Sequence, residues 1–308
     1  MTTFTTAELR GFQQVCTAEG AMVAIACDQR GGMRTLLASE PAAQAAITDA
    51  DLGMVKSDIV RYLGARASAV LLDPVCAVPA VVHDGTLPRD VGLLIGLDAS
   101  GYDTGAAGHR LSRLAKGVTA RRVRELGGTG GKIMVYLRAD RLESDRHNVD
   151  ILHRCIKDFA REDLLLVVEF LTYALDGESK EEHAKALPSL VEGGVHIALD
   201  CGAKFLKVPY PGSAASCAAI NDMAAGVPWT ILSAGVDHAT FLEQVRIAVA
   251  AGASGVIAGR ALWKDCISLD RNETRDRLTR LAVPRLDEIQ AVVREGRRAY
   301  AAAVSAAA

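Results

Sequence analysis

The sequence predicts an α/β protein with a (β/α)8 barrel fold, and three observations support that prediction. The 308-residue chain is 50% hydrophobic but only 5% aromatic, which suits a large aliphatic core. Eight short apolar runs alternate with helical stretches, whereas a doubly wound sheet usually has fewer strands. No composition shift or long Pro- or Ser-rich linker divides the chain. We expect a single domain over residues 1–308, with the barrel proper at about 20–270.

The expected elements alternate along the chain as a parallel barrel requires. Each expected strand is a compact apolar run bounded by polar, glycine or proline residues. The strands are 22–27, 69–72, 92–97, 132–137, 164–170, 204–208, 229–232 and 255–258. The helices are 6–18 before the barrel, 49–63, 120–126, 148–161, 180–201, 214–225 and 239–251 within it, and about 280–303 after it. Residues 98–116 are Gly-rich and are predicted to form a loop.

Bulk charge and terminal composition exclude several classes of partner. A formal net charge of −2 gives no electrostatic basis for binding nucleic acid or an anionic membrane. The N-terminus lacks a basic region followed by an apolar core, and no apolar run reaches membrane-spanning length. Seven scattered cysteines are typical of reduced core residues. We therefore expect a cytoplasmic protein that acts on a small molecule.

Lys207 has the most unusual predicted setting. It lies in the apolar run 204–208, which Pro209 closes. Side chains alternate along a strand, so Phe205 and Lys207 share one face. An ammonium on a covered strand needs a carboxylate partner or must lose its proton, and a neutral lysine amine attacks carbonyls. The alternative is a lysine at a strand end whose ammonium reaches water.

Carboxylates occur at the strand ends where a barrel keeps its active site. Asp28 follows the first expected strand, Asp73 follows the second, and Glu169 lies in the fifth after a run of apolar residues. Glu169 is on the strand next to Lys207, which makes it a candidate counter-ion or proton relay. Lys132 opens the fourth expected strand and would join this cluster, unless it lies at the barrel floor.

The last two expected strands end in Ser233-Ala234-Gly235 and Gly259-Arg260. Small residues there leave backbone N–H groups and helix N-termini open to an anion, and phosphate sites in this fold recur after these strands. Arg260 adds a bidentate donor. The alternative is that Gly235 and Gly259 serve only their turns. Together the two strand ends predict a phosphate-binding site.

The seven histidines show no HxH or HExxH spacing. We expect His147, His153, His183 and His196 to be surface residues, and we expect no metal and no cofactor. This pattern argues against a zinc-dependent aldolase or amidohydrolase, in which strand-borne histidines hold the metal.

Five segments, taken together and in this order along the chain, form a recognisable set of motifs. They are ACDQRG at 26–31, VEFLTY at 168–173, FLKV at 205–208, ILSAGV at 231–236 and GRALW at 259–263. As a set they resemble the class I tagatose-1,6-bisphosphate aldolase family, which includes the sulfofructose-phosphate aldolases. The resemblance runs from about residue 22 to residue 263 and so covers most of the chain.

The resemblance implies an aldolase that joins a lysine to the ketose C2 as a Schiff base and then cleaves C3–C4. The products would be dihydroxyacetone phosphate and an aldehyde, and no metal or cofactor takes part. Position by position, it implies Lys207, Glu169, Asp28 and Lys132 as catalytic residues, and Gln29, Arg30, Ser233, Gly235, Gly259 and Arg260 as residues that bind the substrate or its phosphate.

Two departures from the family pattern leave the aldehyde half open. Family members commonly carry Lys-Val-Glu where this chain has Lys207-Val208-Pro209. Residues 101–104 (GYDT) resemble the tagatose-bisphosphate branch, whereas 228–229 (PW), 259–263 and the C-terminal helix resemble the sulfosugar branch. A sugar-phosphate-binding barrel without aldolase activity and a Schiff-base-free phosphosugar isomerase or epimerase are the alternatives. Homo-oligomers are common among such aldolases, although the sequence does not define the assembly.

Overall fold

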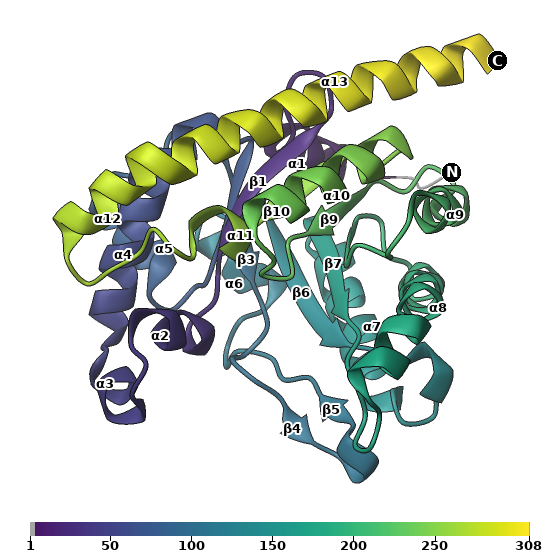
Figure 1. Cartoon of the computed structure of the whole chain (residues 1–308), viewed down its shortest axis with the longest axis horizontal. Coiled ribbons are helices and arrows are strands. Elements are labelled where there is room, and N and C mark those ends of the chain that lie inside the picture. Colours follow the sequence, from purple (N-terminus) through teal and green to yellow (C-terminus); the bar gives the residue numbers. More distant parts are fainter. Residues whose placement is uncertain (1–3, 308) are drawn as a thin grey trace.

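The computed structural model describes residues 4–307 and contains a closed barrel of parallel strands surrounded by helices (Figure 1). The barrel strands are β1 (Met22–Cys27), β2 (Ala69–Leu72), β3 (Gly92–Gly96), β6 (Gly130–Tyr136), β7 (Leu165–Leu171), β8 (Leu206–Val208), β9 (Trp229–Leu232) and β10 (Gly255–Ala258). Around the ring they follow the order β1-β10-β9-β8-β7-β6-β3-β2. The predicted (β/α)8 fold is confirmed, and all eight expected strands are present.

Helices follow most barrel strands and pack around them. They are α1 (Thr6–Val15), α2 (Gly31–Leu37), α3 (Pro41–Ala46), α4 (Asp49–Leu63), α5 (Ala77–His83), α6 (Ala120–Glu125), α7 (Arg146–Arg161), α8 (Lys180–Asp200), α9 (Ala214–Ala224), α10 (His238–Ala250), α11 (Arg260–Trp263), α12 (Arg271–Arg277) and α13 (Val283–Ala307). Five short helices were not predicted, namely α2, α3, α5, α11 and α12. Each has at most seven residues, which is too short to show a clear helical periodicity of apolar residues. No helix within residues 4–307 is long and apolar enough to cross a membrane.

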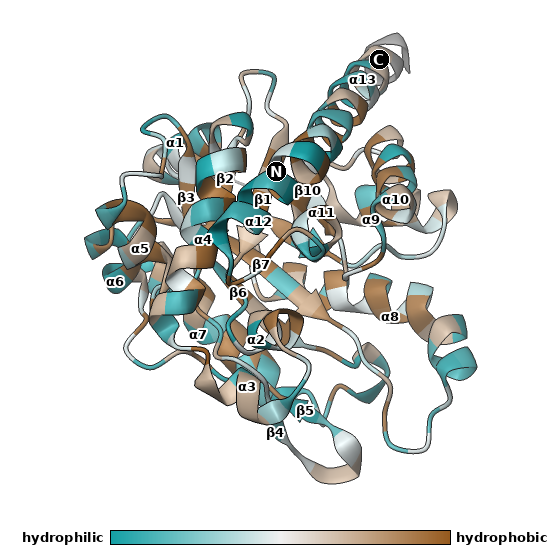
Figure 2. Cartoon of the chain, turned by 60° about the vertical axis from the view of Figure 1, so that its left-hand side comes forward, coloured by the Kyte–Doolittle hydropathy of each residue, from teal (hydrophilic) through white to brown (hydrophobic). Residues whose placement is uncertain are grey.

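The core has two layers, which follow from the alternation of side chains along each strand. Met22, Ala24 and Ala26 of β1 fill the barrel interior together with inward residues of other strands. Val23 and Ile25 point outward and pack beneath the surrounding helices. Brown hydrophobic and teal hydrophilic segments alternate along those helices, as expected when one side packs on the barrel (Figure 2).

Helix α1 closes the barrel at the N-terminal ends of its strands. Its Phe12 ring meets the ring of Phe205, which lies inside the barrel, with 5.5 Å between centroids. Lys204 donates to the buried carboxylate of Glu8 on the same helix (2.6 Å). Helix α1 starts at Thr6, as expected, with Thr5 as its N-cap, but it ends at Val15, three residues before the expected end at residue 18.

Residues 98–116, predicted to be a loop, contain a two-stranded antiparallel hairpin. It consists of β4 (Asp103–Thr104) and β5 (Arg110–Leu111), and it lies at the same end of the barrel as α2 and α3 (Figure 1). Two-residue strands are too short to produce a recognisable alternation, which explains why the sequence pattern did not reveal them. The hairpin stands between β3 and β6 in the chain.

Asp73 follows β2 but does not line the central cavity. Its carboxylate forms an ion pair with the fully buried ammonium of Lys56 on α4. It also accepts the backbone N–H groups of Val75 and Cys76, each at 2.9 Å. Through this ion pair and these hydrogen bonds, the Asp73 carboxylate connects α4 to the turn after β2.

Candidate active site

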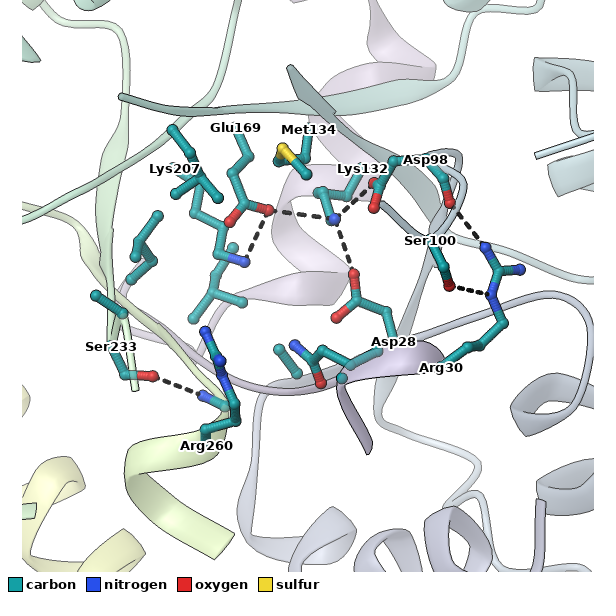
Figure 3. A pocket seen from close by; sticks show the side chains of 18 of the residues that line it. Asp28, Arg30, Asp98, Ser100, Lys132, Met134, Glu169, Lys207, Ser233 and Arg260 are labelled. Carbon is teal, nitrogen blue, oxygen red and sulfur yellow. Dashed lines mark hydrogen bonds and ion pairs between the residues drawn. The ribbon is translucent and has the colours of Figure 1, made fainter. Parts of the chain in front are cut away.

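A cavity of about 530 Å³ opens at the C-terminal ends of the barrel strands. Charged side chains from four different strands or strand ends converge on it, as Figure 3 shows for Asp28, Lys132, Glu169 and Lys207. Because parallel strands all present the same end to this face, residues distant in sequence become neighbours.

Lys207 and Glu169 form a direct ion pair within the cavity. They are paired directly in the register of β7 and β8, and Lys207 Nζ donates to Glu169 Oε2 at 2.9 Å. Only 4% of Lys207 is exposed to solvent, so the alternative of an ammonium that reaches water is wrong. As predicted, Lys207 shares the inner face of its strand with Phe205.

Lys132 lies at the centre of the charged cluster. Its Nζ is 2.7 Å from Asp98 Oδ1, 2.8 Å from Asp28 Oδ2 and 3.2 Å from Glu169 Oε2. Strand β6 begins at Gly130, two residues before the expected start, and this brings Lys132 into the cavity instead of the barrel floor. Glu169 therefore contacts both buried lysines.

Burial and neighbouring charges act in opposite directions on this cluster. Burial raises the pKa of Asp28, but the ammonium groups of Lys132 and Lys207 outweigh it and bring that pKa down to about 2. Burial lowers the pKa of Lys132, but the carboxylates of Asp28, Asp98 and Glu169 raise it well above its ordinary value. The pKa of Asp98 is raised, chiefly by burial. Lys132 is consequently a fixed ammonium at neutral pH.

Two buried oxygens of the β1 end have no hydrogen-bond partner within residues 4–307, namely Asp28 Oδ1 and Gln29 Oε1. Both residues line the cavity. A buried acceptor without a partner is costly, so such atoms are suited to accept hydrogen bonds from a ligand. Arg30, next in sequence, donates to the Asp98 carbonyl oxygen at 3.0 Å and to Ser100 Oγ at 3.4 Å.

The ends of β9 and β10 form a second wall of the cavity. Ser233, Gly259 and Arg260 line it, and the Gly259 N–H donates to Ser233 Oγ at 3.4 Å. Gly235 lies behind the wall: a Cβ built on it would be only 3.3 Å from Cζ of Arg260. Gly235 also has a φ of 82°, which favours glycine. Because Gly235 has no side chain, the Arg260 guanidinium can lie directly against it.

Sequence reasoning missed several cavity residues. Asp98 follows β3 just as Asp28 follows β1, so the strand-end rule could have found it. Met134 and Tyr136 lie two and four residues beyond Lys132 on the same inward face of β6. Within the described part of the chain, no group of three His, Cys, Asp or Glu side chains is arranged to hold a metal ion.

Two buried lysines among carboxylates at the C-terminal ends of barrel strands are residue types suited to chemistry on carbonyl compounds. The sequence profile of the DeoC/LacD family aldolases matches residues 22–265. The chain belongs to this family and is an aldolase.

Two relatives with the same name show how far the similarity extends. Tagatose 1,6-diphosphate aldolase of Staphylococcus aureus strain bovine RF122 / ET3-1 is 26% identical over 319 residues, covering 94% of this chain and 95% of the relative. The enzyme of that name from S. aureus strain Newman gives the same identity and coverage.

Solved structures with this fold include two fructose-bisphosphate aldolases. The enzyme from Slackia heliotrinireducens has a TM-score of 0.64 at 18% identity and covers 94% of this chain and 90% of its own. An archaeal fructose-1,6-bisphosphate aldolase, solved with its catalytic lysine covalently bound to the carbinolamine intermediate, has a TM-score of 0.63 at 18% identity and covers 92% and 98%. At this level of identity the likeness shows the fold.

Proposed function

We propose that this protein is a class I aldolase that forms a Schiff base through Lys207 and cleaves a ketose 1-phosphate between C3 and C4. The products are dihydroxyacetone phosphate and an aldehyde. The observation that carries the proposal is the unequal setting of the two buried lysines. Lys132 is held as an ammonium by three carboxylates, whereas Lys207 pairs with one carboxylate among the described residues, that of Glu169.

Glu169 is placed to accept the proton that Lys207 must lose before it attacks the C2 carbonyl. The distance of 2.9 Å between Lys207 Nζ and Glu169 Oε2 is that of a direct hydrogen bond. The ammonium of Lys132, 3.2 Å from Glu169 Oε2, provides a donor for an oxygen that develops negative charge. The amine adds to C2 to give a carbinolamine, which loses water to give the iminium.

The iminium then draws the electron pair of the breaking C3–C4 bond and becomes an enamine. The C4 hydroxyl proton must leave at the same step, and we assign its removal to Glu169 or Asp28. Asp28 Oδ1 and Gln29 Oε1, which have no partner among residues 4–307, are suited to accept hydrogen bonds from sugar hydroxyls. Protonation of the enamine and hydrolysis of the second iminium release dihydroxyacetone phosphate and restore the Lys207 amine.

The wall formed by Ser233, Gly259 and Arg260 supports binding of the 1-phosphate. Arg260 is exposed at the cavity, and no carboxylate lies within 4 Å of its guanidinium among the described residues. Strands β9 and β10, which carry this wall, follow β8 around the ring, so the phosphate end of the substrate would lie beside Lys207.

Pro209 stands where family members commonly carry an acid. It is buried directly after β8 and does not line the cavity. The acids nearest Lys207 are instead supplied by other strands, with Glu169 across the β7–β8 pair. The proposed proton transfers therefore do not need a carboxylate at position 209.

A substrate panel tests the proposal. We expect release of dihydroxyacetone phosphate, followed through a coupled dehydrogenase, from at least one of tagatose 1,6-bisphosphate, fructose 1,6-bisphosphate and 6-deoxy-6-sulfofructose 1-phosphate. The substrate used fastest identifies the aldehyde half. Formation of an isomeric sugar without any three-carbon product would contradict the proposal, as would saturable binding of all three compounds without cleavage.

A further inference from the structure

A second cavity, of about 460 Å³, lies outside the barrel wall between helix α13 and the segment that leads into β1. Figure 1 shows this purple segment beside the yellow helix α13. Ala21 and Val23 line one side of the cavity, and Val293 and three arginines of α13 line the other. It shares no residue with the central cavity, so it is a separate feature of the molecule, here called the α13 cavity.

The α13 cavity lies at the end of the barrel opposite to the candidate active site. Thr17 and Ala21 come before the first residue of β1, whereas Asp28 follows the last. The turn at residues 17–21 is closed by the Thr17 N–H, which donates to the Ala21 carbonyl oxygen at 2.7 Å. A ligand in the α13 cavity and a substrate at Lys207 would therefore occupy different places at the same time.

Arg294, Arg297 and Arg298 dominate the charge of this cavity. In the described part of the chain, no carboxylate oxygen lies within 4 Å of a guanidinium nitrogen of these three residues, although Arg285 on the same helix pairs with Asp265. Residues three and four apart on a helix are neighbours, and like charges at this spacing repel one another. An anion bound between the three guanidinium groups would offset that repulsion.

The guanidinium of Arg297 is held in place, but its hydrogen bonding is incomplete. Its Nη1 donates to the carbonyl oxygens of Gly252 and Ala253 at 3.4 and 3.5 Å, which are both long contacts. The Tyr300 ring lies against one face of the group, with 5.7 Å between its centroid and Cζ. The buried Nε has no hydrogen-bond partner among residues 4–307. A guanidinium that is oriented and still has unused donors is suited to bind an anion.

The charge of the α13 cavity also differs from that of the whole protein. The chain has a formal net charge of −2. The residues described as lining the cavity include one acid, Glu19, and three arginines, which leaves an excess of two positive charges. Glu19 is exposed to solvent, and this weakens its attraction for the arginines. The cavity is therefore a local region of positive potential that attracts anions.

The number of donors and the size of the cavity indicate which anions are suitable. A carboxylate has two acceptor oxygens, whereas a phosphate monoester has three, and arginine binds phosphate in a bidentate manner. Three guanidinium groups therefore match phosphate better than a single carboxylate. A volume of about 460 Å³ is within the range of small-molecule sites, and the apolar side chains of Val23 and Val293 can pack against the carbon atoms of an organic phosphate.

We propose that the α13 cavity is a binding site for a phosphorylated small molecule with two or more negative charges, and that Arg294, Arg297 and Arg298 bind its phosphate groups. This site is separate from the proposed aldolase reaction and does not depend on it. Loss of aldolase activity with intact binding at the α13 cavity would refute the proposed function alone.

Titration calorimetry with inorganic pyrophosphate tests this site. Because the proposed function also assigns phosphate binding to Arg260, the reference protein is the Arg260→Gln variant, to which we expect saturable one-to-one binding of pyrophosphate. Adding Arg294→Gln and Arg298→Gln to this variant is expected to weaken binding at least about tenfold, because charge-assisted hydrogen bonds are lost. Both side chains are exposed, so folding should be unaffected, and the thermal midpoint without pyrophosphate verifies this.

Arg10→Gln with Arg280→Gln, introduced into the same Arg260→Gln protein, is the matched control. Both arginines are exposed and line neither cavity, and the pair changes the net charge by the same amount. We expect this control to bind pyrophosphate within about twofold of the Arg260→Gln protein. Equal weakening by the two pairs would reduce the effect to overall charge and overturn the proposal.

Three further results would also overturn the proposal. The absence of pyrophosphate binding from Arg260→Gln would restrict phosphate binding to the central cavity. Citrate binding as tight as that of pyrophosphate would show that the site does not select phosphate. Dissociation of an oligomer by Arg294→Gln with Arg298→Gln, seen by sedimentation and without any pyrophosphate binding to Arg260→Gln, would assign these arginines to a contact between subunits.

Discussion

Replacement of Lys207 by methionine is expected to lower kcat for aldol cleavage by at least about four orders of magnitude, because no other group in the cavity can supply a neutral amine. Methionine fills a similar volume and needs no counter-ion, so the buried site remains packed. The measurement is single-turnover release of dihydroxyacetone phosphate from the best substrate of the panel, together with the far-UV spectrum to verify folding.

Lys204→Met is the matched control for this change. Lys204 lies three residues earlier, but its ammonium contacts Glu8 at the opposite end of the barrel. We expect cleavage by this variant at close to the wild-type rate, with reduced thermal stability because Glu8 loses its partner. Cleavage by Lys207→Met within about tenfold of the wild-type rate would assign the nucleophile to another residue.

Replacement of Lys132 by methionine is expected to produce the largest loss of stability. Lys132 is the shared partner of Asp28, Asp98 and Glu169, and removing one member of a buried ionic group costs about 3–5 kcal/mol. The midpoint of urea unfolding at pH 7 measures the loss. Lys132→Arg, which keeps the positive charge, is expected to lose less.

The stability loss of Lys132→Met is also expected to depend on pH. Asp28 has a folded-state pKa of about 2 against an ordinary value of 3.8, so it contributes stability above about pH 4 that is lost as the pH falls through this interval. The variant lacks the ammonium that is the main cause of that depression. The difference in unfolding free energy between wild type and variant should therefore be largest near neutral pH and narrow below about pH 4. A difference that stays constant from pH 7 to pH 3 would contradict this account.

Much of the fold and part of the site could be predicted because the relevant signals are local. Short apolar runs closed by polar residues marked all eight strands, and the same ends marked Asp28 and Arg260. The neighbouring strand positions of Glu169 and Lys207 followed from the order of strands in a barrel, and the register pairs them directly. These inferences need only the chain sequence and the rule that barrel sites lie at the carboxyl ends of strands.

The start of β6 could not be predicted from local propensity, because Gly130 and Gly131 are poor strand formers. Tertiary packing requires them there. A Cβ on Gly131 would clash with the ring of Phe159 on α7, and one on Gly130 would lie 2.7 Å from the Leu165 carbonyl oxygen. The glycines let neighbouring elements approach closely, and this packing sets the register that brings Lys132 into the cavity.

The hairpin environment of Arg110 was also beyond sequence reasoning. The guanidinium carbon of Arg110 lies 4.6 to 5.3 Å from the ring centroids of Tyr102, Tyr136 and Tyr173, which belong to separate segments of the chain. Nothing in the spacing of these residues signals that they meet. Contacts of this kind depend on how loops fold over the barrel mouth. The rule that barrel active sites lie at the carboxyl ends of the strands does not predict them.

The formation of a Schiff base at Lys207 is tested most directly by reduction with borohydride in the presence of dihydroxyacetone phosphate, followed by peptide mass mapping. We expect one reduced adduct per chain, located on the peptide that contains Lys207 and absent from Lys207→Met. An adduct on Lys132, or the absence of any adduct from wild-type enzyme that releases dihydroxyacetone phosphate under the same conditions, would contradict it.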